Sequence, residues 1–151
     1  GGNILTVTPM VTARDTDPMA LHIKRTVEQM VADANKEVEE ISINDAKALV
    51  GREDVLFIDI RDIRELAKTG RVSGARHVPR GMLEMWIDPD TPYHRDFFAE
   101  DKKFVFYCAG AWRSALAAKT AQDMGLTPVA HLEGGIKAWI EAGGPIDPPR
   151  E

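Results

Sequence analysis

The chain of 151 residues has a single cysteine, Cys108, and no long apolar run. One cysteine excludes an internal disulfide and a resolving thiol, so any sulfur chemistry must finish on an external acceptor. The same scarcity suits a reducing compartment, and we expect a cytoplasmic protein. No stretch approaches the length of a membrane span, and the N-terminus lacks the pattern of a secretory signal, so we expect no membrane partner.

Basic residues are also fewer than acidic ones: the chain has 19 Lys and Arg and 24 Asp and Glu, which gives a formal net charge of -5. Nucleic-acid binding relies on a basic face, so we expect no nucleic-acid partner. His77, His94 and His131 have no second cysteine at metal-ligand spacing, which predicts no metal site, and no motif calls for a cofactor. Gly134-Gly135 lacks the longer glycine pattern of a phosphate loop and predicts a tight turn.

What the sequence does contain is a regular alternation of strand and helix patterns, with hydrophobic residues making up 44% of the chain. That alternation predicts an α/β fold with a parallel sheet and helices on both faces. The expected strands are residues 40–42, 55–60, 75–78, 103–107 and 127–132. The expected helices between and after them are residues 43–50, 62–68, 81–87, 113–124 and 135–142.

An additional amphipathic helix is predicted before the first strand, over residues 18–38, with Asp17 as its N-cap and Pro18 in its first turn. Its apolar residues recur at helical spacing: Ile23, Val27, Met30, Val31, Ala34 and Val38. We expect this stripe to pack on its own domain; the alternative is a homodimer contact. The chain thus divides into an N-terminal arm and helix, residues 1–39, and a domain with a short extended tail, residues 40–151.

Cys108 follows an apolar strand and precedes a short turn and an alanine-rich helix. On that fact alone, a lone cysteine is usually a buried small hydrophobe. The turn favours a different interpretation, because it places the sulfur beside a helix N-terminus, whose free N–H groups and dipole stabilise a thiolate. Gly110 permits unusual backbone angles, and amides bent around one centre form an anion site. Arg113 follows after four intervening residues, so its guanidinium and the sulfur can face one pocket.

The neighbouring polar residues allow two roles each. Asp59 ends a strand, as Cys108 does, and ligands bind beyond such strand ends in open sheets. We expect Asp59 and Arg61 to form a structural pair that braces the loop, in preference to contacting substrate. Arg113 either acts in the pocket, which we favour, or pairs with an acidic residue. Trp112 either walls the pocket or covers the core, and Arg80 is expected at the solvated surface.

Three stretches resemble the motifs of rhodanese-like sulfurtransferase domains. The sequence CAGAWRS, residues 108–114, is similar to the active-site loop of that family. Asp59-Ile60-Arg61 with residues 65–79 is similar to its N-terminal signature, and residues 131–139 to its C-terminal one. The resemblance covers about residues 40–144 and implies a five-stranded parallel sheet, to which the first helix is an addition. The loop departs from the commonest family pattern at Ala109 and Ala111.

The resemblance implies transfer of sulfane sulfur. The Cys108 thiolate would take the outer sulfur of a small donor such as thiosulfate, and cyanide, a small thiol or a protein acceptor would remove it from the persulfide. Arg113 would be the second catalytic residue, steadying the oxyanion of the donor. The residues that would hold the persulfide are those of the loop: Ala109, Gly110, Ala111, Trp112 and Ser114.

Two other functions stay open. Rhodanese-related dual-specificity phosphatases use a similar thiolate and arginine with one more residue between them, so phosphate-ester or arsenate chemistry is the enzyme alternative. Four intervening residues favour a single sulfur atom in the narrower cradle. The second alternative is an interaction module that has kept the fold without the chemistry, although such domains usually lack the cysteine.

Overall fold

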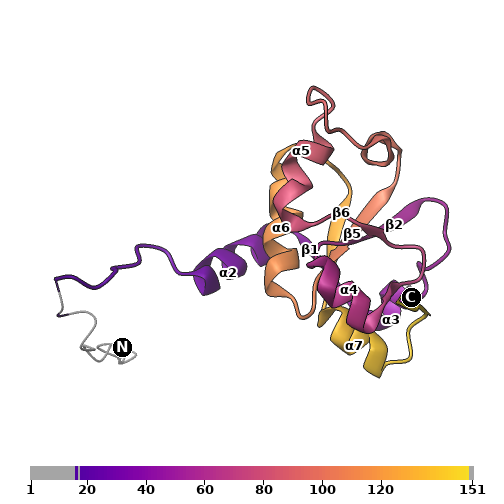
Figure 1. The fold of residues 1–151 in the computed structure, drawn as a ribbon, viewed down its shortest axis with the longest axis horizontal. Helices are drawn as coiled ribbons and strands as arrows, with labels where there is room; N and C mark the ends of the chain where they lie inside the picture. Colours follow the sequence, from indigo (N-terminus) through magenta and orange to yellow (C-terminus); the bar gives the residue numbers. More distant parts are fainter. Residues whose placement is uncertain (1–15, 17, 150–151) are drawn as a thin grey trace, which may run out of the picture.

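The computed structural model describes residue 16 and residues 18–149, and its centre is a five-stranded parallel sheet (Figure 1). The strand order is β1-β6-β5-β2-β4, and every neighbouring pair is parallel. The predicted α/β fold with helices on both faces is therefore confirmed. The strands are β1 (Glu39–Ile41), β2 (Val55–Asp59), β4 (Arg76–His77), β5 (Lys103–Tyr107) and β6 (Val129–Leu132).

The central strand β5 carries apolar side chains on both of its faces. Phe104 and Phe106 belong to one buried cluster, and Val105 and Tyr107 belong to another, because successive side chains of a strand point to opposite faces. Helices cover both clusters, which is why the strand reads as an uninterrupted apolar run. This double burial holds the end of β5, and so Cys108, in a fixed position.

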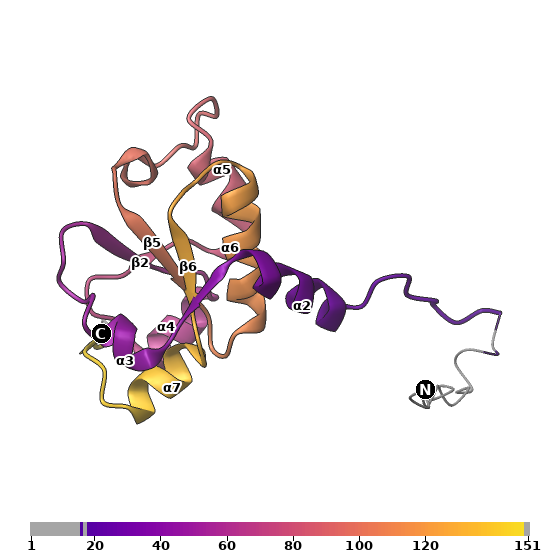
Figure 2. The same ribbon diagram turned by 180° about the vertical axis from the view of Figure 1, so that it is seen from behind.

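Two layers of helices complete the fold (Figure 2). On one face, α5 (Leu83–Ile87) and α6 (Trp112–Asp123) contribute to the same buried cluster as Phe104. On the other face, α3 (Ile43–Lys47) and α7 (Gly135–Glu141) pack against the cluster of Tyr107. The remaining short elements are α4 (Ile63–Thr69), η1 (Arg80–Met82) and η2 (Asp96–Ala99). None of the helices in the described part of the chain is long and apolar enough to cross a bilayer.

The N-terminal helix α2 (Val27–Glu37) is shorter than predicted. Thr26 caps it, accepting a hydrogen bond from the Gln29 amide at 3.1 Å while the Gln29 side chain accepts one from the Thr26 amide at 2.9 Å. This reciprocal capping box fixes the helix start, so the prediction of a start at Pro18 is wrong. Asp17, its expected cap, lies outside the described residues.

The apolar stripe of α2 is divided between the core and the surface. Val31 and Ala34 are buried against Ala115 of α6, so the helix packs on its own domain, as expected. Val27 and Met30 remain exposed on the outer side of the same helix. The helix therefore reaches the sheet edge with its C-terminal half, beside β1 and β6.

A small second sheet was not predicted. Strands β3 (Arg71–Val72) and β7 (Ile146–Asp147) pair in antiparallel orientation. The prediction treated the C-terminal segment as an extended tail and missed the pairing, because two-residue strands are too short to show a periodic pattern. The pairing draws the end of the chain back onto the domain beside α4.

Candidate active site

Cys108 stands at the carboxyl end of β5, which lies between β2 and β6 at the centre of the sheet. The residue is only 2% exposed, and part of its surface packs in the same cluster as Ala117 and Ala118 of α6. The rest faces an open pocket of about 470 Å³. The pocket residues besides Cys108 are Gly110, Ala111, Trp112, Arg113 and Gly134. Cys108 thus lines a pocket with the small part of its surface that is not packed in the core.

The first residues of α7 fix the peptide orientations of the cysteine loop. The Ile136 amide donates to the Cys108 carbonyl at 2.9 Å, and the Lys137 amide donates to the Ala109 carbonyl at 3.3 Å. In a trans peptide the C=O and the following N–H point in opposite directions, so the N–H groups of Ala109 and Gly110 point away from α7. Among the described residues, the amides of residues 109–114 have no protein acceptor. They are free to bind an anion.

Gly135 allows α7 to approach the loop this closely. It has φ +62°, and a Cβ at this position would overlap the carbonyl oxygens of Cys108, Ala109 and Gly110. The tight turn predicted at Gly134-Gly135 is present between β6 and α7. Gly110, in contrast, does not have a positive φ, so the backbone freedom that glycine permits there is not used for a left-handed conformation. A Cβ at Gly110 would meet nothing within 4 Å, because the position faces open space.

Arg113, which lines this pocket, makes a bidentate ion pair with Glu65. Its Nη1 and Nη2 each donate to a carboxylate oxygen of Glu65, on α4, at 2.9 Å. The hydrogen bond from Arg113 is the main reason that the pKa of Glu65 lies below its usual value, and the same bond raises the pKa of Arg113. Arg113 thus pairs with an acidic residue and also lines the pocket of Cys108, and its action in the pocket stays a prediction.

Asp59 and Arg61 form the buried pair that the sequence predicted. Arg61 Nη2 donates to Asp59 Oδ2 at 2.8 Å and to the Gly70 carbonyl at 2.9 Å, and Arg61 Nε donates to Asp59 Oδ1 at 3.0 Å. The Arg61 side chain is 1% exposed. Burial alone would lower the pKa of this guanidinium, but the hydrogen bond and charge of Asp59 outweigh burial and raise it. The pair lies at the end of β2, next to β5, the strand that leads into Cys108.

A chain of polar side chains that the sequence did not indicate also reaches Cys108. The Ser114 hydroxyl lies 3.6 Å from Cys108 Sγ and 3.2 Å from His131 Nδ1. His131 Nε2 in turn lies 2.7 Å from Asn35 Oδ1, on α2. The sequence predicts no more than an ordinary polar contact for His131 and gives no indication of Asn35. No local pattern indicates this contact, because the three side chains come from separate elements.

The other polar and aromatic candidates lie as follows. Trp112 is 53% exposed and lines the pocket, so it forms a wall of the pocket and does not cover the core. Arg80 pairs with Glu84 at 2.7 Å and is not among the pocket residues of Cys108. The Nε2 of His77 donates to the Arg61 carbonyl at 2.7 Å. No group of His, Cys, Asp and Glu among the described residues could hold a metal ion.

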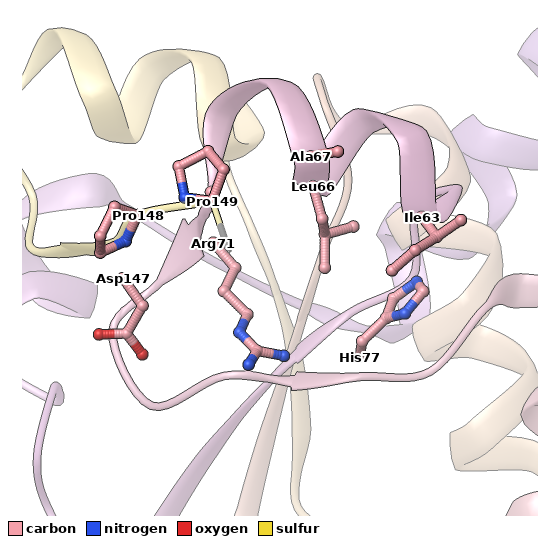
Figure 3. A pocket seen from close by; sticks show the side chains of 9 residues that line it. Ile63, Leu66, Ala67, Arg71, His77, Asp147, Pro148 and Pro149 are labelled. Carbon is pink, nitrogen blue, oxygen red and sulfur yellow. The ribbon is translucent and has the colours of Figure 1, made fainter. Parts of the chain in front are cut away.

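A second pocket lies elsewhere on the domain (Figure 3). It has a volume of about 620 Å³ and lies between α4 and the C-terminal segment. Ile63 and Leu66 form an apolar wall, and Arg71 and Asp147 lie opposite them. Cys108 does not line it, and its lining has no thiol or hydroxyl side chain. We therefore place the candidate active site at the smaller pocket, which Cys108 lines.

Comparison with known proteins gives consistent relatives. The model of the rhodanese-like domain matches residues 42–142. A mouse thiosulfate sulfurtransferase/rhodanese-like domain-containing protein 3 is 24% identical over 105 residues, which are 66% of this chain and 67% of that protein. A tRNA uridine(34) hydroxylase of Acinetobacter baumannii is 31% identical over 102 residues, or 62% of this chain. The match covers only 29% of the hydroxylase.

Solved structures show the same fold. A protein of unknown function from Rhodopseudomonas palustris, called a possible tyrosine phosphatase, is 56% identical with a TM-score of 0.83, over 85% of this chain and 99% of that one. The polysulfide-sulfur transferase homodimer of Wolinella succinogenes is 30% identical with a TM-score of 0.61, over 80% and 86% of the two chains. Thiosulfate sulfurtransferase of Pseudomonas aeruginosa, 22% identical with a TM-score of 0.67 over 82% and 23%, shares the fold.

Proposed function

The chain belongs to the rhodanese-like domain family, and from this premise we propose that it is a sulfurtransferase working through a Cys108 persulfide. It moves sulfane sulfur from a donor such as thiosulfate to a thiophilic acceptor, either cyanide or a thiol. The observation that carries the proposal is the single cysteine lining an open pocket, next to a loop whose amides have no acceptor within the described part of the chain. A persulfide is an anion, and such amides stabilise negative charge.

The two half-reactions need only groups already in the pocket. The Cys108 thiolate attacks the outer sulfur of thiosulfate; a new S–S bond forms, the S–S bond of thiosulfate breaks, and its electron pair leaves with sulfite. Cyanide then attacks the outer sulfur of the persulfide, so that a C–S bond forms and thiocyanate leaves as the thiolate returns. Anions enter and leave the pocket in both steps. Arg113, which lines the pocket, offsets that charge.

Glu65 competes with the donor for Arg113, and this gives a first prediction. Because the carboxylate holds both Nη atoms, an anionic donor must share or displace it. Glu65→Gln is expected to lower KM for thiosulfate by roughly two- to fivefold, as expected for losing a partly exposed ion pair, with kcat changed less. Steady-state kinetics at low ionic strength measure it. A rise in KM would instead show that Glu65 positions Arg113 for the donor.

A phosphatase is the second candidate, favoured by the 56% identity to the protein called a possible tyrosine phosphatase. Both chemistries use a thiolate and an arginine. The four residues between Cys108 and Arg113 give a short loop, which favours one sulfur atom over a tetrahedral phosphate. The presence of both side chains in one pocket also favours an enzyme over an interaction module.

Intact-protein mass spectrometry separates these functions. After incubation with thiosulfate we expect a gain of one sulfur atom, located on Cys108 by peptide mapping and lost when cyanide is added. Hydrolysis of a generic aryl phosphate by the same sample should stay at background. Phosphate release without sulfur uptake would replace the proposal by the phosphatase function, and neither activity would favour the interaction module.

The physiological partners follow from the same chemistry. We propose a small sulfur donor and a thiol, cyanide or protein acceptor, in a reducing compartment such as the cytoplasm, because the single cysteine of the chain is the reactive one. A homodimer is a further proposal, supported by the Wolinella succinogenes homodimer and by the exposed Val27 and Met30 on α2. The pathway served by the transfer depends on which acceptor is used.

A further inference from the structure

The hydrogen-bonded chain behind Cys108 leads from the sulfur to a residue outside the matched domain. It runs from Cys108 through Ser114 and His131 to Asn35, on the N-terminal helix α2. The family match begins at residue 42, so α2 is an addition that reaches the candidate active site from behind. Ser114 and His131 are both fully buried, at 0% exposed. Apolar side chains of similar shape in place of such buried polar groups are often as stable or more stable. The presence of this polar chain next to Cys108 therefore points to a role other than stability.

The contacts at Nε2 decide which ring nitrogen of His131 carries the proton. Asn35 Oδ1 lies 2.7 Å from Nε2 and Glu40 Oε2 lies 3.4 Å from it. Both are acceptors, so the proton is on Nε2. Burial lowers the pKa of His131 to about 4, so the ring is neutral near pH 7. Nδ1 therefore presents a free lone pair toward Ser114.

The Ser114 hydroxyl has one proton and two candidate acceptors. These are His131 Nδ1 and the Ala111 carbonyl, each 3.2 Å away. Donation to Ala111 would leave the buried Nδ1 without a donor, which is the more costly arrangement. The proton therefore goes to Nδ1, and the oxygen lone pairs of Ser114 are left to accept from the Cys108 thiol. Both hydrogen bonds then run in the same direction: the Cys108 thiol donates to Ser114, and the Ser114 hydroxyl donates to His131 Nδ1.

We propose that His131 receives the thiol proton of Cys108 through the Ser114 hydroxyl, and that Asn35 holds the imidazole in the tautomer that this requires. The S–H bond breaks and its proton joins Ser114, while the former hydroxyl proton of Ser114 forms an N–H bond at Nδ1. The products are a thiolate and an imidazolium, with no net change in charge. The inference rests on the proposed function only in taking Cys108 as the nucleophile.

The surrounding charges favour this pair of ions. Glu40, on β1, faces the Nε2–H of His131, and Arg113, on α6, lies on the sulfur side, where it pairs with Glu65 of α4. Asp59 of β2 is already neutralised by Arg61. Glu40 and the newly formed thiolate both attract an imidazolium in this place, whereas burial, which lowers the pKa of His131, opposes it. Asn35 and His131 are positioning residues, since they act on the sulfur through Ser114.

The pH dependence of Cys108 alkylation by iodoacetamide tests the relay. Only the thiolate reacts, so the midpoint of rate against pH reports its formation. Asn35→Leu is expected to raise that midpoint by about one pH unit, the effect of losing a hydrogen bond to a charged group. Asn35→Asp, which keeps an acceptor at Nε2, should restore the wild-type midpoint or lower it. Ser114→Ala should raise the midpoint and remove any further effect of Asn35→Leu.

The matched control is Val31→Ala, one turn earlier on α2. It loosens the packing against Ala115 without touching His131, so it should lower the melting temperature and leave the midpoint unchanged. An unchanged midpoint in Asn35→Leu, or an equal shift in Val31→Ala, would overturn the relay. Alkylation needs no thiosulfate, so an Asn35→Leu shift in a protein that forms no persulfide would sustain the relay and reject the sulfurtransferase.

Discussion

Cys108→Ser is expected to reduce thiosulfate:cyanide turnover by on the order of a thousandfold or more, to the background of the uncatalysed reaction. A serine hydroxyl is a far weaker acid than a thiol and does not form the stable persulfide equivalent. The substitution exchanges one atom of a side chain that is 2% exposed, and the new hydroxyl can still donate to Ser114, which already lies beside the sulfur. Folding should therefore be nearly unchanged.

Turnover, sulfur uptake by mass and thermal unfolding together check this expectation. The variant should lose the first two and keep a melting temperature within a few degrees of wild type. Residual sulfur transfer at more than a few per cent would show that another group carries the sulfur. Loss of activity together with unfolding would leave Cys108→Ala as the deciding variant, because alanine fits the same space without a polar group.

The central strand was predictable because its burial on both faces shows as a run of consecutive apolar residues. The apolar run at residues 103–107 predicts β5 with the bounds that the structure has. The abrupt change at Cys108 likewise predicts the turn into α6. Each of these features depends on neighbours in sequence, so a local pattern suffices. The same is true of Asp59 and Arg61, which are two residues apart and form the expected pair.

The parts that sequence analysis missed depend on contacts between distant segments. Asn35 and His131 are 96 residues apart, and neither has a neighbour that marks it as part of a site. Strands β3 and β7 are similarly far apart and too short to show alternation. The start of α2 was placed too early because Asp17-Pro18 resembles a helix start, whereas the capping box at Thr26 and Gln29 determines it.

The role of Gly135 shows how a local motif acquires its meaning from a distant contact. Sequence analysis predicts a tight turn at Gly134-Gly135 and nothing more. The structure shows that the absence of a side chain at Gly135 lets α7 bind the carbonyls of Cys108 and Ala109. That contact turns the loop amides away from α7 and leaves them free. The reactive-loop geometry is thus determined by a residue that contributes no functional group.

Arg61→Ala is expected to destabilise the fold by about 3–5 kcal/mol, because it leaves the Asp59 carboxylate buried without its cation. The change also removes hydrogen bonds to the Gly70 carbonyl and the Thr69 hydroxyl. For a chain of this size, that energy corresponds to a fall in melting temperature of roughly 10 °C. Thermal or urea unfolding measures it, provided that the transition is two-state.

Arg64→Ala is the matched control, since Arg64 pairs with Asp62 at the same two-residue spacing but on the surface. It should change stability little, because exposed ion pairs contribute little. The double variant Asp59→Leu/Arg61→Met removes both buried charges and should be more stable than Arg61→Ala alone. If Arg61→Ala were as mild as Arg64→Ala, the buried pair would not be what holds this end of β2. Tyr107 links the Arg61 side chain to the cysteine loop. Its ring lies 6.0 Å from the Arg61 guanidinium, and its hydroxyl accepts a hydrogen bond from the Val72 amide. Because Tyr107 directly precedes Cys108, loss of the Arg61 side chain would also disturb the position of Cys108.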